Sequence, residues 1–259
     1  MKFDDRLIAK ETFHSFLTNK EIHEFHMHQF YAPDIEQTLF LPEEESLHCT
    51  KVLRLTDGTS ISISDGKGNR FVANIVHAHP KQTLIELVEK VHEPRDESNL
   101  THIAIAPTKN KDRMEWFVEK ATEIGIDIIT PVFCHFSERK SISAERLEKI
   151  AVAAMKQSQR AYLPTLNPSI SLHQLLNQTT EKQRFIAHCY EEERTLLQSV
   201  YKPDRTAVVL IGPEGDFTHE EIAEALQHGF LPVSLGNNRL RTETAGIVAC
   251  HTMQLQRYL

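Results

Sequence analysis

Two glycine-bearing loops in the last third of the chain have residue types suited to binding a ligand. Gly212-Pro213-Glu214-Gly215 follows the apolar run 207–211, and Gly236 follows a second apolar run, 231–235. Such runs are typical of buried parallel strands, and open α/β sheets bind ligands in the crevice beyond the carboxyl ends of their strands. Glycine lets the main chain pass close to a ligand and present its N–H and C=O groups. We therefore expect the two loops to end neighbouring strands and to line one ligand crevice.

Charged residues beside these loops are the candidates for catalysis. Arg239 and Arg241 flank the second loop, and Arg160 ends a helical pattern further upstream. A surface arginine is most often in an ion pair worth less than about 1 kcal/mol, whereas arginines grouped beside a ligand loop can hold a phosphate or a carbonyl group through paired hydrogen bonds. Glu243 can pair with one of these arginines or act as a base, and pairing is favoured. The sequence thus gives Arg241, Glu243 and Arg160 as catalytic candidates.

A sheet is needed to position these loops, and the sequence predicts one within residues 99–259. Apolar runs alternate with segments in which apolar residues recur three or four positions apart, the spacing of an amphipathic helix. Thr218 and Glu221 have the spacing of a capping box, which predicts a helix start after the first glycine loop. The alternation indicates a mostly parallel sheet with helices on both faces. The predicted strands include 102–106, 127–132 and 185–189, and the predicted helices include 113–124 and 144–159.

An alternating pattern predicts a compact β-barrel over residues 28–95. Residues 61–64 and 71–75 alternate between apolar and polar side chains, and the glycine-bearing tetrapeptide 65–68 between them predicts a hairpin turn. The polar, proline-containing segment 92–99 then marks a domain boundary.

The composition disfavours a membrane or metal protein. A net charge of −7 argues against indiscriminate adhesion to nucleic acid, although a local basic face is enough for RNA binding. The 4 cysteines are scattered and the 15 histidines fit no ligand geometry, so we expect reduced thiols in a cytoplasmic protein without a metal site. No apolar run approaches the roughly 18 residues that span a bilayer. Residues 1–27 are interpreted as an extension ahead of a start at Met27, with a genuine N-terminal helix as the alternative.

The order and spacing of several motifs carry a family resemblance from about Gln29 to the C-terminus. The motifs are Glu119-Lys120-Ala121-Thr122-Glu123-Ile124-Gly125, Gln157-Ser158-Gln159-Arg160, Gly212-Pro213-Glu214-Gly215 and Arg239-Leu240-Arg241-Thr242-Glu243-Thr244-Ala245. Together they resemble the bacterial 16S ribosomal RNA uridine-N3 methyltransferases, which belong to the knotted SPOUT superfamily. The resemblance implies a SPOUT domain with a C-terminal trefoil knot, a PUA-like RNA-binding barrel, S-adenosylmethionine as cofactor, the small-subunit 16S ribosomal RNA as substrate, and a homodimer.

The resemblance also assigns the cofactor contacts. They map onto Leu210, Ile211, Gly212, Gly215, Leu235, Gly236, Leu240, Arg241, Thr242, Thr244 and Ala245. His188 and Cys189 lie at another predicted strand end, and we expect them to line the same pocket. Asp216 stands where the family often has a glycine. Its carboxylate can attract the sulfonium cation of the cofactor, or it can sit favourably before the helix that follows, and the second interpretation is preferred.

Basic residues outline a path for the substrate RNA. Lys109, Lys111 and Arg113 follow a predicted strand end, and others are scattered over the barrel. The residues predicted to contact RNA are Lys51, Arg54, Arg70, Lys109, Lys111, Arg113 and Arg239.

Three other functions compete with uridine methylation. The nearest is another SPOUT methyltransferase that acts on transfer RNA or on a ribose 2′-hydroxyl. A second is a non-catalytic RNA-binding or ribosome-assembly module without a cofactor. A small-molecule hydrolase is weaker because the chain has no Gly-x-Ser-x-Gly motif. A dinucleotide-binding site is disfavoured because no Gly-x-Gly-x-x-Gly motif follows the first strand. A Walker-type nucleotide site is disfavoured because the chain has no Gly-Lys-Ser/Thr.

Overall fold

The computed structural model describes residues 27–190 and 194–257. The chain divides between Glu93 and Pro94 into two compact units, and each is described by itself. The predicted extension, residues 1–27, lies outside the described residues except for Met27.

The first unit is built on a four-stranded sheet in the order β1-β2-β3-β4. Strands β2 and β3 are antiparallel with Ile63 opposite Phe71, which confirms the predicted hairpin. The side chains that alternate inward, including Ile61, Phe71 and Ile75, form a buried core with Phe30. The elements are β1 (Gln29–Tyr31), α3 (Ile35–Thr38), α4 (Glu43–Leu47), the π-helical turn η1 (His48–Val52), β2 (Ser60–Ser64), β3 (Asn69–His77) and β4 (Leu84–His92).

The second unit contains a parallel sheet in the order β10-β12-β9-β11-β5-β6-β7, with β8 also paired to β6. Its central strands β5 and β11 are buried at every residue, as near-continuous apolar runs require. The strands are β5 (Thr101–Ile105), β6 (Ile128–Phe133), β7 (Thr165–Leu166), β8 (Ile170–Ser171), β9 (Gln183–Ala187), β10 (Thr195–Leu196), β11 (Ala207–Ile211) and β12 (Leu231–Ser234).

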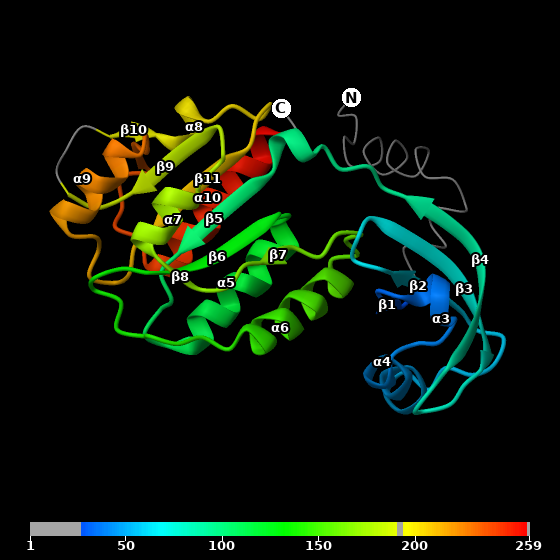
Figure 1. Ribbon diagram of the computed structural model, residues 1–259. Helices are drawn as coiled ribbons and strands as arrows, with labels where there is room; N and C mark the ends of the chain where they lie inside the picture. The colour runs from blue at the N-terminus through cyan, green and yellow to red at the C-terminus, as the bar shows by residue number, and fades with distance from the viewer. Residues whose placement is uncertain (1–26, 191–193, 258–259) are drawn as a thin grey trace, which may run out of the picture. The chain divides into compact units, whose positions relative to one another are not determined.

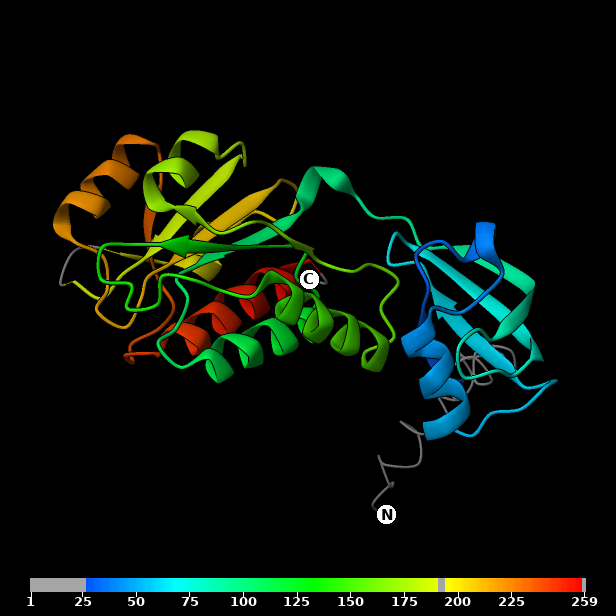
Figure 2. The same cartoon turned by 60° about the horizontal axis from the view of Figure 1, so that its bottom comes forward.

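Helices cover both faces of this sheet, as predicted (Figure 1). Figure 2 shows α10 in red, α5 in teal and α6 in green side by side on one face, with α9 in orange on the other. Thr218 caps α9 through the predicted capping box with Glu221. The helices are α5 (Lys111–Ile124), α6 (Ala144–Gln157), α7 (Leu172–Gln178), α8 (Leu197–Val200), α9 (His219–Gln227) and α10 (Thr242–Gln256), and a 3-10 turn η2 (Glu97–Asn99) precedes β5.

The last helix, α10, returns from the β12 side of the sheet to pack on α5 and β5. Gln254 near its end donates to Thr101 Oγ1 at 2.8 Å and to the carbonyl oxygen of Gly125 at 2.7 Å. These bonds fix the end of α10 against the start of β5. The threading of this helix through the loop after β11 stays a prediction. Within residues 27–190 and 194–257, no helix combines the length and the apolar character needed to cross a membrane.

Candidate functional site

Two cavities open at the carboxyl ends of β9, β11 and β12. The first, called the glycine cavity, has a volume of about 280 Å³ and is lined by Ala187, Cys189, Ile211, Gly212, Pro213, Glu214, Asp216, Arg239, Leu240, Arg241, Thr242 and Ala245. The second, called the asparagine cavity, has a volume of about 440 Å³ and is lined by Cys189, Tyr190, Arg194, Gly215, Asp216, Gly236, Asn237, Asn238 and Arg239. Because Cys189, Asp216 and Arg239 line both, the two cavities adjoin.

The expectation that the two glycine loops end neighbouring strands is wrong, because β9 lies between β11 and β12. The order of strands in a sheet is set by long-range pairing, which a run of apolar residues does not encode. The loops nevertheless meet, since Thr242 Oγ1 donates a buried hydrogen bond to the carbonyl oxygen of Gly212 at 3.0 Å. The intervening strand adds Ala187 and Cys189 to the site.

Gly212 and Gly215 are required for close packing of the first loop. A Cβ atom on Gly212 would lie 2.9 Å from the ring of Phe217, and one on Gly215 would lie 2.9 Å from Cβ of Phe136. Both distances are shorter than real Cβ atoms show. These two glycines are therefore required for packing against Phe217 and Phe136. Their contact with a ligand stays a prediction.

Most of the predicted cofactor residues gather at these cavities. Ile211, Gly212, Leu240, Arg241, Thr242 and Ala245 line the glycine cavity, and Gly215 and Gly236 line the asparagine cavity. The other predicted cofactor residues line neither of the two. Leu210 is fully buried in the core beneath the other face of the sheet, and His188 is 4% exposed. His188, Leu210, Leu235 and Thr244 are thus near the site in sequence without lining its cavities.

Several lining residues were not predicted from the sequence. Asn237 and Asn238 lie within the second loop, and Tyr190 and Arg194 follow β9. The two asparagines had a signal, since they stand between two residues that the sequence did single out, Gly236 and Arg239. Tyr190 and Arg194 had none, because their place depends on β9 pairing between the other two strands.

Cys189 is the cysteine at the junction of the cavities. Burial raises the pKa of its thiol, and the negative charge of Asp216 raises it further. The thiol is therefore protonated near neutral pH. A protonated thiol is a weak nucleophile, so the site is suited to direct transfer chemistry rather than to a covalent cysteine intermediate.

The three catalytic candidates lie in different places. Arg241 lines the glycine cavity with an exposed side chain. Glu243 is buried and lies 3.7 Å from Nε of Arg113 on α5, so the expected pairing is found, but with a different arginine. Arg160 donates to the carbonyl oxygens of Thr122 and Ile126 at 2.8 and 3.1 Å, beyond the end of α5 remote from the cavities. Within one chain, the structure does not bring Arg160 together with Arg241.

The predicted RNA contacts are also dispersed. Lys109 Nζ is 2.8 Å from Glu138 Oε2, and Arg113 pairs with Glu243. Lys111 lines a third cavity, described below, and Arg239 lines both cavities of the site. In the first unit, Lys51 and Arg54 are exposed around η1, and Arg70 forms an ion pair with Glu93.

Asp216 ties the first glycine loop to the end of β9. Its Oδ2 accepts a hydrogen bond from the main-chain N–H of Cys189 at 2.7 Å, and its Oδ1 accepts one from the N–H of Phe217 at 2.9 Å. Its φ of 66° lies in the left-handed region, where glycine is at ease and aspartate is tolerated. The carboxylate thus has a structural use that neither sequence interpretation included.

Replacing Asp216 by glycine and by alanine separates the loss of its hydrogen bonds from the cost of its left-handed backbone conformation. We expect Asp216→Gly to lower the free energy of unfolding by roughly 1–2 kcal/mol, because the variant cannot form the two hydrogen bonds that the carboxylate accepts. Asp216→Ala should cost about 1 kcal/mol more, since alanine also pays for the left-handed backbone. Chemical denaturation of both variants measures the difference. Equal stability of the alanine and glycine variants would contradict the left-handed conformation.

Comparison with known proteins gives two family matches. A family model described as an RNA methyltransferase domain matches residues 95–254. A second model, described as an RNA methyltransferase PUA domain, matches residues 41–88.

Individual relatives match over most of the chain. The ribosomal RNA small subunit methyltransferase E of Buchnera aphidicola is 29% identical over 228 residues, which cover 85% of this chain and 89% of the relative. A crystal structure of an rRNA methyltransferase from Porphyromonas gingivalis is 42% identical, has a TM-score of 0.83 and aligns over 89% of this chain and 99% of its own. A methyltransferase of Legionella pneumophila, solved with bound SAM, is 30% identical, with a TM-score of 0.80 and coverages of 89% and 98%.

Proposed function

The chain belongs to the RNA methyltransferase family, within its small-subunit methyltransferase E type, and from this premise we propose that it transfers a methyl group from S-adenosylmethionine to N3 of a uridine in 16S ribosomal RNA. The single observation that carries this proposal is the pair of adjoining cavities with a shared wall of Cys189, Asp216 and Arg239. A transfer reaction between two bound molecules needs two such compartments that meet.

The residues of the glycine cavity fit S-adenosylmethionine. Ala187, Ile211, Leu240 and Ala245 give it an apolar lining, and the loop that contains Gly212 and Pro213 forms part of the wall. An apolar pocket with a few main-chain polar groups suits a flat adenine ring. When bound, the cofactor supplies an activated methyl group on a positively charged sulfur.

The asparagine cavity fits the acceptor base. Asn237, Asn238, Arg194 and Arg239 offer amide and guanidinium donors, which match the two carbonyl oxygens beside N3 of uracil. We place the acceptor in this cavity and the donor in the other, with N3 facing the shared wall.

The protein then has two tasks, to align the reactants and to stabilise the charge that develops on the base. Alignment can supply about 7–11 kcal/mol of the barrier, whereas general-base assistance contributes only about 10²–10⁴-fold in rate. Positioning therefore dominates. Arg241 stabilises the negative charge that uracil develops as its N3 proton passes to solvent water, as a preorganised cation does in other transfer reactions. Glu243 is paired with Arg113 and lines neither cavity, so we give it no role as a base.

The biological setting of the proposal follows from the family. The substrate is 16S ribosomal RNA in the small subunit, the enzyme works as a homodimer in the cytoplasm, and the C-terminal helix is threaded as a trefoil knot around the cofactor. Among the described residues no cluster of three or more metal-ligating side chains occurs, and the reaction as proposed uses no metal.

Methylation of isolated small subunits tests the proposal. We expect the purified chain to transfer labelled methyl groups from S-adenosylmethionine to subunits that lack the modification, and nucleoside analysis to identify 3-methyluridine. Large subunits and transfer RNA serve as controls and should stay unlabelled. Label in a ribose-methylated nucleoside, or in transfer RNA alone, would replace the proposal with the other SPOUT activities.

A further inference from the structure

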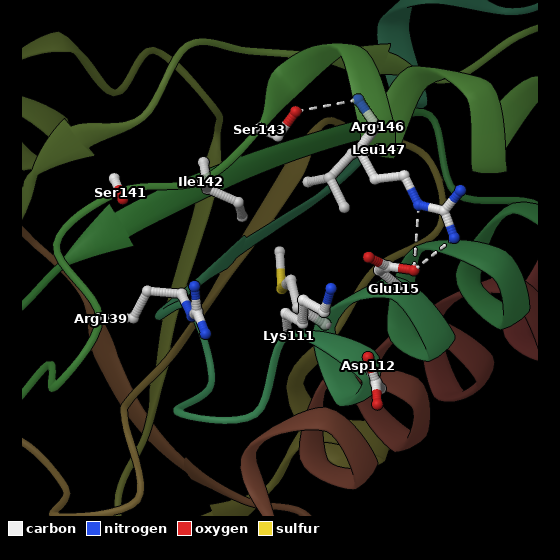
Figure 3. A pocket seen from close by; sticks show the side chains of 10 residues that line it. Lys111, Asp112, Glu115, Arg139, Ser141, Ile142, Ser143, Arg146 and Leu147 are labelled. Atoms are coloured by element: carbon white, nitrogen blue, oxygen red, sulfur yellow. Dashed lines mark hydrogen bonds and ion pairs between the residues drawn. The ribbon is translucent and has the colours of Figure 1, made fainter.

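A third cavity lies where the N-terminal ends of α5 and α6 meet, and it plays no part in the reaction described so far. It has a volume of about 540 Å³ and is lined by Lys111, Asp112, Met114, Glu115, Arg139, Ser141, Ile142, Ser143, Arg146 and Leu147. Figure 3 shows these side chains around the opening. We call it the cationic cavity.

The cationic cavity has an apolar floor. Met114 and Leu147 are 1% and 4% exposed and belong to the main hydrophobic core, and Ile142 packs partly buried against that core. These side chains are held by their neighbours, so the floor is preformed. A flat, partly apolar group such as a nucleobase can lie on such a surface.

The rim carries two cations whose charges are available to a ligand. Arg146 is not one of them, since it donates to Glu115 Oε2 from Nη2 at 2.9 Å and from Nε at 3.2 Å (Figure 3). This hydrogen bond lowers the pKa of Glu115 and keeps the pair charged. Lys111 is exposed at the start of α5, and Arg139 lines the same cavity (Figure 3).

Arg139 carries an unsatisfied donor. Its Nη2 donates to the carbonyl oxygen of Lys109 at 3.0 Å, which fixes the guanidinium. Its Nε is shielded from solvent and has no hydrogen-bond partner in the described part of the chain. Of the five N–H donors of this guanidinium, the described part of the chain engages one, on Nη2, so the group keeps donors for an anion in the cavity.

The surrounding main chain also favours an anion. The cavity lies beside the first turns of two helices of 14 residues each, capped by Asn110 and Ser143. Helix N-termini carry a partial positive charge that attracts phosphate. An apolar floor combined with a cationic rim matches a nucleotide better than it matches an inorganic ion, which has no use for the floor.

The cationic cavity is linked to the glycine cavity through Lys109. The main-chain N–H of Lys109 donates to Glu214 Oε1 at 2.9 Å, and the carbonyl oxygen of Lys109 accepts from Arg139. Glu214 lines the glycine cavity. A nucleic-acid strand with one base at the reaction site therefore has a second binding place along the same edge of the sheet.

We propose that the cationic cavity binds a second nucleotide of the substrate RNA, with Lys111 and Arg139 holding its phosphate and Met114, Ile142 and Leu147 beneath its base. This inference rests on the proposed function. Of the predicted RNA contacts Lys109, Lys111 and Arg113, the proposal keeps only Lys111 and adds Arg139. Lys109 is paired with Glu138, and Arg113 is paired with Glu243.

The test is a salt titration of binding to unmodified small subunits. We expect the double variant Lys111→Ala/Arg139→Gln to bind subunits roughly tenfold more weakly at physiological salt. The slope of log affinity against log salt should fall by about 0.7–0.9 for each phosphate that the variant no longer neutralises. Lys202→Ala is the matched control, because Lys202 is exposed and precedes the amino end of β11, whereas the cavities of the site lie at the carboxyl ends of the strands. Affinity for S-adenosylmethionine, measured by calorimetry, should stay within about twofold.

A substitution in the apolar floor tests the contact with the base separately from the contact with the phosphate. Ile142→Ser should weaken subunit binding several-fold and leave the salt slope unchanged, because it removes apolar surface and no charge. A double variant with the same affinity and slope as the Lys202 control would overturn the proposal, and so would a matching decrease of cofactor affinity.

Failure of the proposed function gives a different result. In that case the wild-type chain transfers no methyl group to subunits. The binding slopes are measured without turnover, so they still decide for or against the cationic cavity.

Discussion

Replacing Arg241 by alanine is expected to lower kcat by about 10²–10³-fold, the usual cost of removing one preorganised charge-stabilising group. The side chain lines the glycine cavity and is exposed. Within residues 27–190 and 194–257 its guanidinium has no hydrogen bond or ion pair on which the fold depends. The variant should therefore keep the stability of the wild type, and its affinity for S-adenosylmethionine should stay within about twofold.

Single-turnover methylation combined with calorimetry measures both effects. Arg239→Ala is the comparison, because Arg239 lines both cavities and belongs to the same loop. We expect the Arg239 variant to raise KM for subunits more than it lowers kcat. If Arg241→Ala turned over at the wild-type rate, the charge-stabilising role would have to pass to another residue.

Arg160 provides a second contrast. Its guanidinium satisfies the carbonyl oxygens of Thr122 and Ile126 near the end of α5, so its removal acts on the fold of the chain. A variant at this position that folds yet fails to turn over would require the arginine of one chain to reach the site of another.

The sequence was informative where local chemistry decides the structure. The strands β11 and β12, the capping box at Thr218 and the hairpin around residues 65–68 all follow from local sequence patterns. The need for glycine in the first loop could also be predicted, because a ligand loop and a tightly packed turn both require a position without a side chain. These features depend on a few neighbouring residues.

The remaining parts of the site depend on pairing between distant segments. Nothing local indicates that β9 lies between the two loop-bearing strands, or that Glu243 meets Arg113 of α5 rather than an arginine of its own loop. Arg139 illustrates the same limit. It stands in a loop without a motif, and only the folded chain places it in one cavity with Lys111.

Gly246 determines the packing of α10, the helix whose first residue, Thr242, bonds to Gly212. A Cβ atom at this position would lie 2.6 Å from Cε2 of Phe117 and 3.0 Å from Cδ1 of Ile105. Both side chains are fully buried, so neither can move toward solvent. Gly246 thus sets how closely α10 approaches α5 and β5.

Gly246→Ala is expected to destabilise the protein, although the same change in a free helix would stabilise it. Alanine gains about 1 kcal/mol in helix propensity, but overpacking a full core costs typically about 1–3 kcal/mol and more where a rigid ring is struck. Because the contact is so short, we expect a net destabilisation of about 1–3 kcal/mol, or about 2–4 °C in Tm for each kcal/mol. Cofactor affinity should fall as well, since α10 carries the Thr242 bond to Gly212.

A double-mutant cycle with Phe117→Leu tests the cause, because a smaller side chain relieves the overlap. Phe117→Leu alone should destabilise the chain, and in the Gly246→Ala background it should cost less, giving a favourable coupling between the two positions. Gly229→Ala is the control, since a Cβ there meets no atom within 4 Å and only its φ of +79° opposes the change. A Gly246→Ala protein that melts at a higher temperature than the wild type would show that α10 can move away from Phe117 at no cost, and the close approach of the two helices would then not be what holds the cofactor loops together.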